Sequence, residues 1–139
     1  MQSIKLTCPK TNTPFGEVFY PGLIVEILLD SGKYQPIEFI LDSGADCTVV
    51  PHFVAKLTGN HLPAKPDAHM TGIAGISMPC YKGNLSLKIR RQKFNVRCLF
   101  TESDKTPFLI GRIDFFSTFQ VLFDGNDCSI VLTRREPMP

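Results

Sequence analysis

The sequence lacks a long apolar run and an apolar leader. Its longest apolar stretch, residues 23–29, is interrupted by Glu26 and falls well short of the roughly 20 residues that span a bilayer. The first five residues carry no apolar core of the kind that a secretory signal needs. We therefore expect no membrane insertion and a cytoplasmic location.

A strong excess of one charge is also missing. Lys and Arg total 15 against 13 Asp and Glu, for a formal net charge of +2. Nucleic-acid-binding proteins concentrate basic side chains on one face. The tightest basic groups, residues 88–93 and 134–135, instead fit a hairpin turn and a C-terminal tail. We expect no nucleic-acid partner.

The cysteines lack the spacing of a disulfide framework or a zinc site. They are odd in number, widely separated, and contain no Cys-x-x-Cys. Free thiols are typical of a reducing compartment. The positions are Cys8, Cys47, Cys80, Cys98 and Cys128.

The sequence does contain the pattern of short strands and turns that is typical of an all-β protein. Its 10 glycines and 11 prolines separate short apolar and β-branched runs. We expect one domain over residues 1–132 and a frayed tail over residues 133–139. The expected strands cover residues 23–29, 37–41, 48–50, 84–89, 94–100, 119–124 and 128–132, with a long hairpin over 68–87 and short helices near 52–58 and 112–118.

A carboxylate directly follows one of these apolar strands. Residues 39–41 are Phe-Ile-Leu, and Asp42, Ser43 and Gly44 come next. A buried carboxylate is costly unless it is hydrogen-bonded or shares a proton. Ser43 and Gly44 can supply donors, and a glycine permits a sharp turn. The same tripeptide at residues 30–32 reads as a plain turn, so the tripeptide alone does not indicate catalysis.

The longer run over residues 39–50 closely resembles the active-site signature of retropepsin-like aspartic proteases, the single-domain, retroviral-type enzymes. Two further segments match in the family's order. Residues 71–75 resemble the glycine-rich tip of the flap, and residues 108–112 resemble the segment that packs beside the active-site loop. The resemblance implies an all-β, small, closed, barrel-like acid-protease half-fold with a β-hairpin flap and one or two short helices.

The resemblance also implies an aspartic endopeptidase that is active as a two-fold homodimer on a peptide or protein substrate. Each subunit would donate one Asp42, and the two carboxylates would share one proton. The ionised carboxylate would take a proton from water, and the protonated one would polarise the scissile carbonyl. This chemistry requires no metal and no cofactor.

The family pattern assigns roles to the neighbouring residues. Ser43 would hydrogen-bond across the dimer axis, and the Gly44 carbonyl would contact the substrate backbone. Asp46 would also contact substrate and would pair with Arg112, because a guanidinium can grip a carboxylate bidentately. Gly111 and Arg112 would support the loop. Without the resemblance, Asp46 is a turn cap and Arg112 a surface charge.

The remaining expected substrate contacts form a lid and two walls. Ile73 would lie at the tip of the flap, between Gly72 and Ala74, and the glycines would permit hinge motion. Alternatively, the flap segment is an ordinary hairpin turn with no role as a lid, and the wall residues are core residues with no role in binding. The expected cleft walls are Ile40, Ala45, Val49 and Leu109.

Two other functions compete with this one. The same fold could serve as a non-catalytic dimerisation or peptide-binding module. A Cys47–His52 nucleophilic pair would be a different class of enzyme, but Asp46 beside Cys47 disfavours the thiolate. The chain also departs from viral members in two respects, one of which is that its C-terminal hairpin over residues 121–132 runs longer than their terminal strand. Residues 19–22 carry no basic side chain where those enzymes use one between subunits, so dimer contacts are expected to involve the hairpin over 121–132.

Overall fold

The computed structural model describes residues 3–72 and 74–136. The strands are β1 (Ser3–Thr7), β2 (Lys10–Thr13), β3 (Gly16–Phe19), β4 (Gly22–Leu28), β5 (Tyr34–Leu41), β6 (Thr48–Val50), β7 (Ala68–Thr71), β8 (Ser77–Ile89), β9 (Gln92–Thr101), β10 (Leu109–Ile110), β11 (Phe119–Asp124) and β12 (Ser129–Arg134), and the helices are α1 (Phe53–Leu57) and α2 (Phe115–Thr118). None of the described helices is long and apolar enough to cross a membrane.

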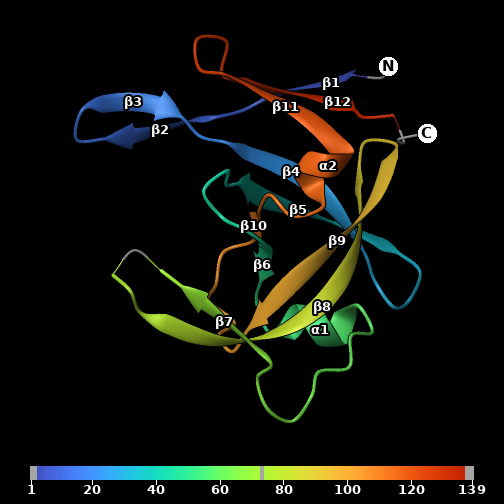
Figure 1. Cartoon of the computed structure of the whole chain (residues 1–139). Helices are drawn as coiled ribbons and strands as arrows, with labels where there is room; N and C mark the ends of the chain where they lie inside the picture. Colours follow the sequence, from blue (N-terminus) through green and yellow to red (C-terminus); the bar gives the residue numbers. More distant parts are fainter. Residues whose placement is uncertain (1–2, 73, 137–139) are drawn as a thin grey trace.

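Six strands close into a small barrel in the order β4-β5-β10-β6-β9-β8 (Figure 1). The closure is an antiparallel contact between β4 and β8, in which Glu26 lies opposite Lys88 and Ile27 opposite Leu87. The short strand β10 lies parallel to β5 and antiparallel to β6. The predicted all-β, closed, barrel-like fold with few short helices is therefore confirmed.

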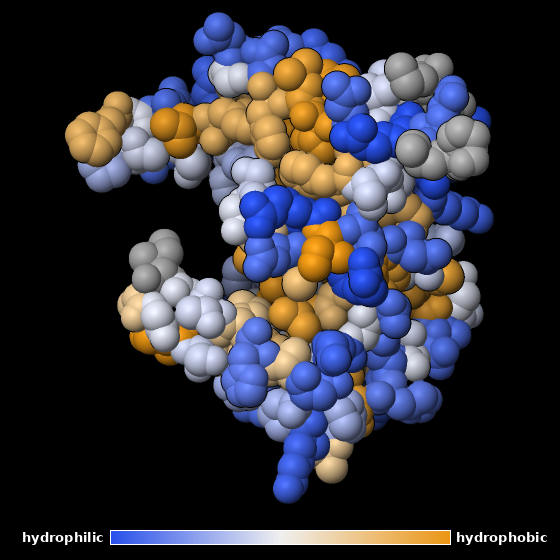
Figure 2. Space-filling model, viewed as in Figure 1, coloured by the Kyte–Doolittle hydropathy of each residue, from blue (hydrophilic) through white to orange (hydrophobic). Residues whose placement is uncertain are grey.

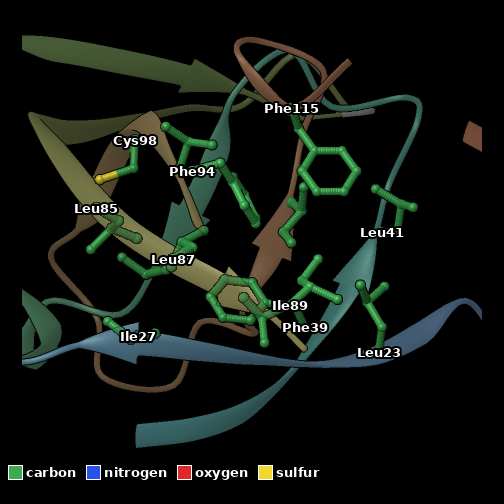
Figure 3. Packing of buried hydrophobic residues seen from close by; sticks show 14 of the residues in the cluster. Leu23, Ile27, Phe39, Leu41, Leu85, Leu87, Ile89, Phe94, Cys98 and Phe115 are labelled. Atoms are coloured by element: carbon green, nitrogen blue, oxygen red, sulfur yellow. The ribbon is translucent and has the colours of Figure 1, made fainter. Parts of the chain in front are cut away.

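The interior of the barrel is filled by the side chains on one face of each long strand. Over residues 85–89 of β8 and residues 94–100 of β9 every second residue is buried, which is the period-two alternation that the sequence displays. Each fully buried aliphatic or aromatic side chain stabilises the fold by about 1.5–3 kcal/mol relative to an exposed one. The side chains that meet in the interior include Leu23, Ile27, Phe39, Leu41, Leu85, Leu87, Ile89, Phe94, Cys98 and Phe115 (Figure 3).

A cluster of phenylalanines attaches α2 to the barrel. The Phe115 ring is completely buried and lies 5.5 Å from the Phe94 ring and 5.3 Å from the Phe119 ring, between centroids. Phe94 and Phe119 also meet edge-on at 5.2 Å. Such edge-to-face pairs add to the free energy gained from burial alone. The cluster fixes the segment that follows β10.

A second sheet, in the order β1-β12-β11, lies above the barrel in Figure 1. The expected hairpin of β11 and β12 is present, whereas β1, β2 and β3 were not predicted. The tail expected to fray from residue 133 is instead part of β12 through Arg134, because Thr133 pairs with Ser3 of β1. The Arg135 N–H also donates to the Thr118 carbonyl at 2.8 Å.

We predict that Phe115→Ala lowers the free energy of unfolding by about 3–5 kcal/mol, as expected when a fully buried ring is removed. Chemical denaturation monitored by circular dichroism measures the loss. Leu57→Ala is the matched control, because the Leu57 side chain is 50% exposed and its truncation is expected to cost little. Equal losses in the two variants would contradict the role given to the phenylalanine cluster.

Candidate active site

Asp42 lies at the point where β5 leaves the barrel, and β10 holds it there. The Asp42 N–H donates to the Ile110 carbonyl at 2.9 Å, and the Ile40 N–H donates to the Phe108 carbonyl at the same distance. Strand β10 lies between β5 and β6 in the sheet. The loop over residues 42–47 connects β5 to β6, so both of its ends are next to β10. This topology fixes both ends of the loop.

The Asp42 carboxylate is partly exposed and is oriented by its own loop. The Gly44 N–H donates to the Asp42 Oδ1 at 2.9 Å, and the Ala45 N–H donates to the Asp42 carbonyl at 3.1 Å. A Cβ at residue 44 would lie only 3.2 Å from Oδ1, so glycine suits this close approach. The other carboxylate oxygen, Oδ2, has no hydrogen-bond partner within the described chain.

The Ser43 hydroxyl is exposed, and no group among residues 3–72 and 74–136 hydrogen-bonds to it. The expected hydrogen bond of Ser43 across a dimer axis involves a second chain, so it stays a prediction.

The segment after β10 is hydrogen-bonded to the residue 42–47 loop. The Arg112 N–H donates to the Ala45 carbonyl at 2.9 Å, and the Ile113 N–H donates to the Asp46 carbonyl at 2.8 Å. The Arg112 guanidinium also forms an ion pair with the Asp46 carboxylate. The two side chains are 51% and 77% exposed, so solvent screens the pair in the isolated chain.

Gly111 permits the closest contact between the two segments. A Cβ at residue 111 would lie 2.4 Å from the carbonyl carbon and oxygen of Cys47, a separation that no side chain can occupy. The Gly111 N–H donates to the Oγ1 of the buried Thr48 at 3.3 Å. Any side chain at residue 111 would push β10 away from the loop that carries Asp42.

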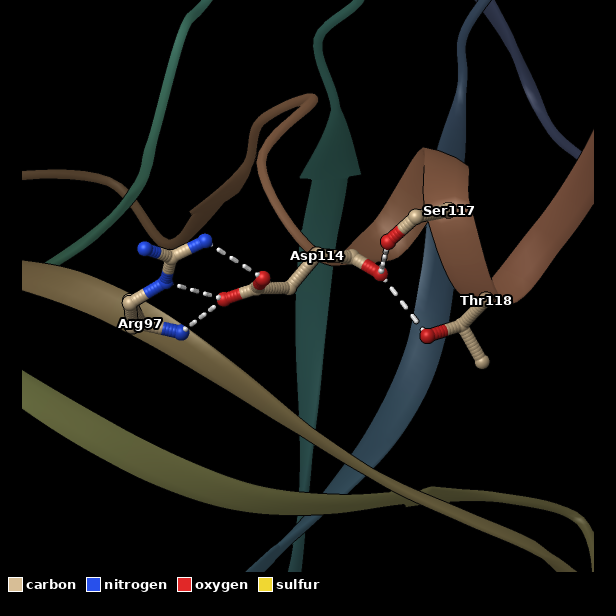
Figure 4. A network of polar contacts seen from close by, with 4 residues as sticks. All are labelled: Arg97, Asp114, Ser117 and Thr118. Carbon is tan, nitrogen blue, oxygen red and sulfur yellow. Dashed lines mark hydrogen bonds and ion pairs between the residues drawn. The ribbon is translucent and has the colours of Figure 1, made fainter. Parts of the chain in front are cut away.

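A second ion pair, between Asp114 and Arg97, fastens the same segment to β9 (Figure 4). The Asp114 carboxylate accepts hydrogen bonds from the Arg97 backbone N–H at 2.7 Å, from Nε at 3.0 Å and from Nη2 at 2.9 Å. The Asp114 carbonyl accepts bonds from the hydroxyls of Ser117 and Thr118. The hydrogen bonds from Arg97 lower the pKa of the Asp114 carboxyl below its usual value.

This pair changes the expected boundary of the second helix. Asp114 has a φ of 69°, so the helix predicted over residues 112–118 begins only at Phe115. Aspartate tolerates this left-handed conformation better than most residues. The pair itself was missed, since nothing local in the sequence signals that Arg97 and Asp114 meet.

Three of the expected wall residues lie side by side. Leu109 of β10 pairs with Ile40 of β5 on one side and with Val49 of β6 on the other. Ile40, Ala45 and Leu109 are partly exposed, whereas Val49 is 4% exposed and offers little surface to a ligand. The wall is therefore made mainly by the first three.

The expected flap is a β-hairpin of β7 and β8 that extends on the same side of the molecule as the residue 42–47 loop (Figure 1). Its tip is closed by hydrogen bonds from the Gly72 N–H to the Ile76 carbonyl and from the Gly75 N–H to the Gly72 carbonyl. Gly72 and Ala74 are exposed. Ile73, the expected lid residue, lies outside the described residues. Figure 2 shows a hollow between this hairpin and the upper part of the molecule.

Cys47 does not have the environment of a nucleophile. Burial, followed by the neighbouring Asp46 charge, raises the pKa of the Cys47 thiol. The His52 ring packs against Tyr81, with centroids 5.7 Å apart. Burial also raises the pKa of the Cys98 thiol, to about 12. These thiols are protonated at neutral pH, which disfavours the alternative Cys–His enzyme.

A family model matches the part of the chain that contains the strand, the Asp-Ser-Gly loop and the segment after β10. The model for the retroviral aspartyl protease matches residues 18–123. The chain belongs to this family. No curated protein sequence gives a significant match.

A solved structure of a retropepsin-like protease shares the fold. A retropepsin-like aspartic protease from Rickettsia conorii is 16% identical with a TM-score of 0.58, and the match covers 94% of this chain and 91% of that one. The EIAV protease in complex with the inhibitor HBY-793 is 21% identical with a TM-score of 0.48, over 67% of this chain and 82% of that one. At these identities the Rickettsia likeness supports the retropepsin fold alone.

We predict that Asp114→Asn lowers the melting temperature by a few degrees near neutral pH, and that the difference disappears in acid. A carboxyl whose pKa is depressed in the folded state stabilises the fold above its unfolded pKa of about 3.9. That stabilisation is lost as the pH falls through the folded value. Asparagine also tolerates a positive φ, so the backbone is not newly strained.

Thermal melts of both proteins between about pH 3 and pH 7 measure the effect. Glu17→Gln is the control, because Glu17 is exposed and forms no ion pair with any described residue. A difference between wild type and Asp114→Asn that stays constant across this range would contradict the ion-pair assignment.

Proposed function

We propose that the protein is an aspartic endopeptidase in which two copies of the chain each supply one Asp42. The observation that supports this most is the state of the Asp42 carboxylate. One oxygen accepts the Gly44 N–H, while the other has no partner within the described chain and lies on an exposed loop. A carboxylate held in this way is oriented yet free to exchange a proton.

One chain supplies only half of the required chemistry. Peptide hydrolysis without a covalent intermediate needs a base for the water and an acid for the carbonyl oxygen. The only other Asp-Ser-Gly, at residues 30–32, lies in the turn between β4 and β5, where the Asp30 N–H donates to the Leu57 carbonyl at the end of α1. A two-fold axis beside Asp42 would bring two such carboxylates together, where they share one proton.

In the proposed reaction, the ionised Asp42 removes a proton from water as the water oxygen attacks the scissile carbonyl carbon. The other Asp42 donates its proton to the carbonyl oxygen. As the tetrahedral intermediate collapses, the Asp42 that took the water proton gives it to the amide nitrogen, and the other Asp42 removes a proton from one hydroxyl of the intermediate. The carbon–nitrogen bond breaks in the same step. The two carboxylates then return to the singly protonated state. The Ser43 hydroxyl, which has no partner among the described residues of one chain, would hydrogen-bond across the axis and hold the two loops together.

The substrate is proposed to be an extended peptide beneath the β7–β8 hairpin. Ile40, Ala45 and Leu109 offer apolar surface beside Asp42, which favours apolar side chains next to the cleaved bond. Asp46 would bind the peptide backbone, and Gly44 would offer its carbonyl. In this proposal Arg112 positions Asp46 rather than touching the substrate.

A non-catalytic peptide-binding or dimerisation module is the alternative. It would need the same fold and the same dimer, so the oligomeric state does not separate the two functions. It would not need a carboxylate with a free oxygen at the base of the cleft. The loss of cleavage on neutralising that carboxylate separates them.

We predict that Asp42→Asn lowers the rate of peptide cleavage by about a thousandfold or more, because an amide can serve neither as the base nor as the shared acid. Digestion of a diverse peptide pool, followed by mass spectrometry, measures cleavage. Asp30→Asn is the matched control, since it makes the same change in the second Asp-Ser-Gly and leaves the proposed site intact.

Equal cleavage by wild type and Asp42→Asn would remove the catalytic role of Asp42. Absence of cleavage by a dimeric wild-type sample would favour the binding module.

A further inference from the structure

The hairpin of β2 and β3 projects from the body of the protein on the same side as the residue 42–47 loop and the β7–β8 hairpin (Figure 1). We call residues 9–20 the arm. Within the described chain, β2 and β3 pair only with each other. Isolated two-stranded hairpins are marginally stable in water, so an arm of this kind gains stability from a surface to pack against.

The base of the arm is followed by a residue that hydrogen-bonds to the last residue of β5, just before the proposed catalytic loop. The Tyr20 N–H donates to the Pro9 carbonyl at 2.9 Å and closes the base. The next residue, Pro21, accepts a hydrogen bond from the Leu41 N–H at 2.8 Å, and Leu41 immediately precedes Asp42. The arm therefore starts at the edge of the face that carries Asp42.

The arm carries apolar side chains that the chain itself does not cover. Phe15, at its tip, is 100% exposed, and Val18 is 45% exposed. At the other end the Phe19 ring packs edge-on against Phe123, with centroids 6.3 Å apart. Phe123 itself is 37% exposed. Apolar surface thus runs along the arm and onto the body of the protein (Figure 2).

We propose that the arm of each copy clasps a second copy of this chain and that Phe15 is its anchor. This inference rests on the proposed function, which places two Asp42 residues on one axis. The six residues of extended chain from Pro9 to Pro14 span about 17 Å between their end Cα atoms. The arm projects on the side of the molecule that carries the residue 42–47 loop (Figure 1) and is long enough to contact a partner that stands over this side.

The second copy is the occupant that the geometry favours. Any chain that brings its own Asp42 to this Asp42 must stand over the same face, within reach of the arm. The two-fold axis makes the contact reciprocal, so the dimer contains it twice and each Phe15 is buried once, with no further component. Aromatic side chains buried in this manner are the usual energetic centres of interfaces.

Most of the arm is also outside the part of the chain that the family model matches. That match begins at Val18, so β2, the tip and the first half of β3 precede it. The clasp is thus an addition to the half-barrel that carries Asp42.

Sedimentation equilibrium of Phe15→Ser tests the proposal. We expect the dissociation constant of the dimer to rise about tenfold or more, because an aromatic anchor is lost. Folding should be unchanged, since the Phe15 side chain is fully exposed in the single chain. Leu57→Ser is the matched control on α1, another exposed apolar position, and is expected to leave the dissociation constant unchanged.

A second measurement identifies what Phe15 touches. Benzoylphenylalanine placed at residue 15, in a mixture of nitrogen-14 and nitrogen-15 chains, should give photo-cross-linked pairs that contain both isotopes. Cross-links confined to one copy would overturn the clasp. So would a wild type that stays monomeric at every concentration, or a Phe15→Ser variant with unchanged dimer affinity.

Failure of the clasp and failure of the proposed function give different results. If Phe15→Ser dimerises as the wild type does and cleavage still depends on Asp42, only the clasp is wrong. If cleavage does not depend on Asp42, the proposed function is wrong, whatever the arm does.

Discussion

The two-residue strand β10 holds the loop that carries Asp42. The Asp42 N–H donates to the Ile110 carbonyl on one side, and the Gly111 backbone approaches Cys47 too closely for any side chain on the other. Behind β10, Asp114 binds Arg97 of β9, and Phe115 is buried among other rings. The position of one carboxylate therefore depends on the packing of the barrel rather than on the loop alone.

Several features of the same face are incomplete in a single chain. The Ser43 hydroxyl and one oxygen of Asp42 have no partner among the described residues, and the Asp46–Arg112 pair is open to solvent. The arm extends from the edge of this face with Phe15 fully exposed. In the proposed dimer, a second copy on a two-fold axis would complete the carboxylate pair and cover the arm. One physical requirement thus accounts for separate observations.

The sequence predicted those parts of the fold that depend on local pattern. Period-two alternation located β8 and β9, and the strand followed by Asp-Ser-Gly located the candidate loop. It missed β2, where Lys10, Thr11, Asn12 and Thr13 show no apolar alternation. It also missed the turn at Asp114, because a positive φ there is stabilised by an arginine 17 residues away. Contacts between distant residues leave no local signal of that kind.

The central claim is that two chains share one catalytic centre. Calorimetric titration with a peptide analogue tests this claim most directly. In the analogue, a tetrahedral carbon bearing a hydroxyl replaces the scissile carbonyl. Such analogues bind through the groups that stabilise the transition state. The account predicts one analogue bound for every two chains, and loss of binding with Asp42→Asn. One analogue bound to each chain, or unchanged binding to Asp42→Asn, would contradict it.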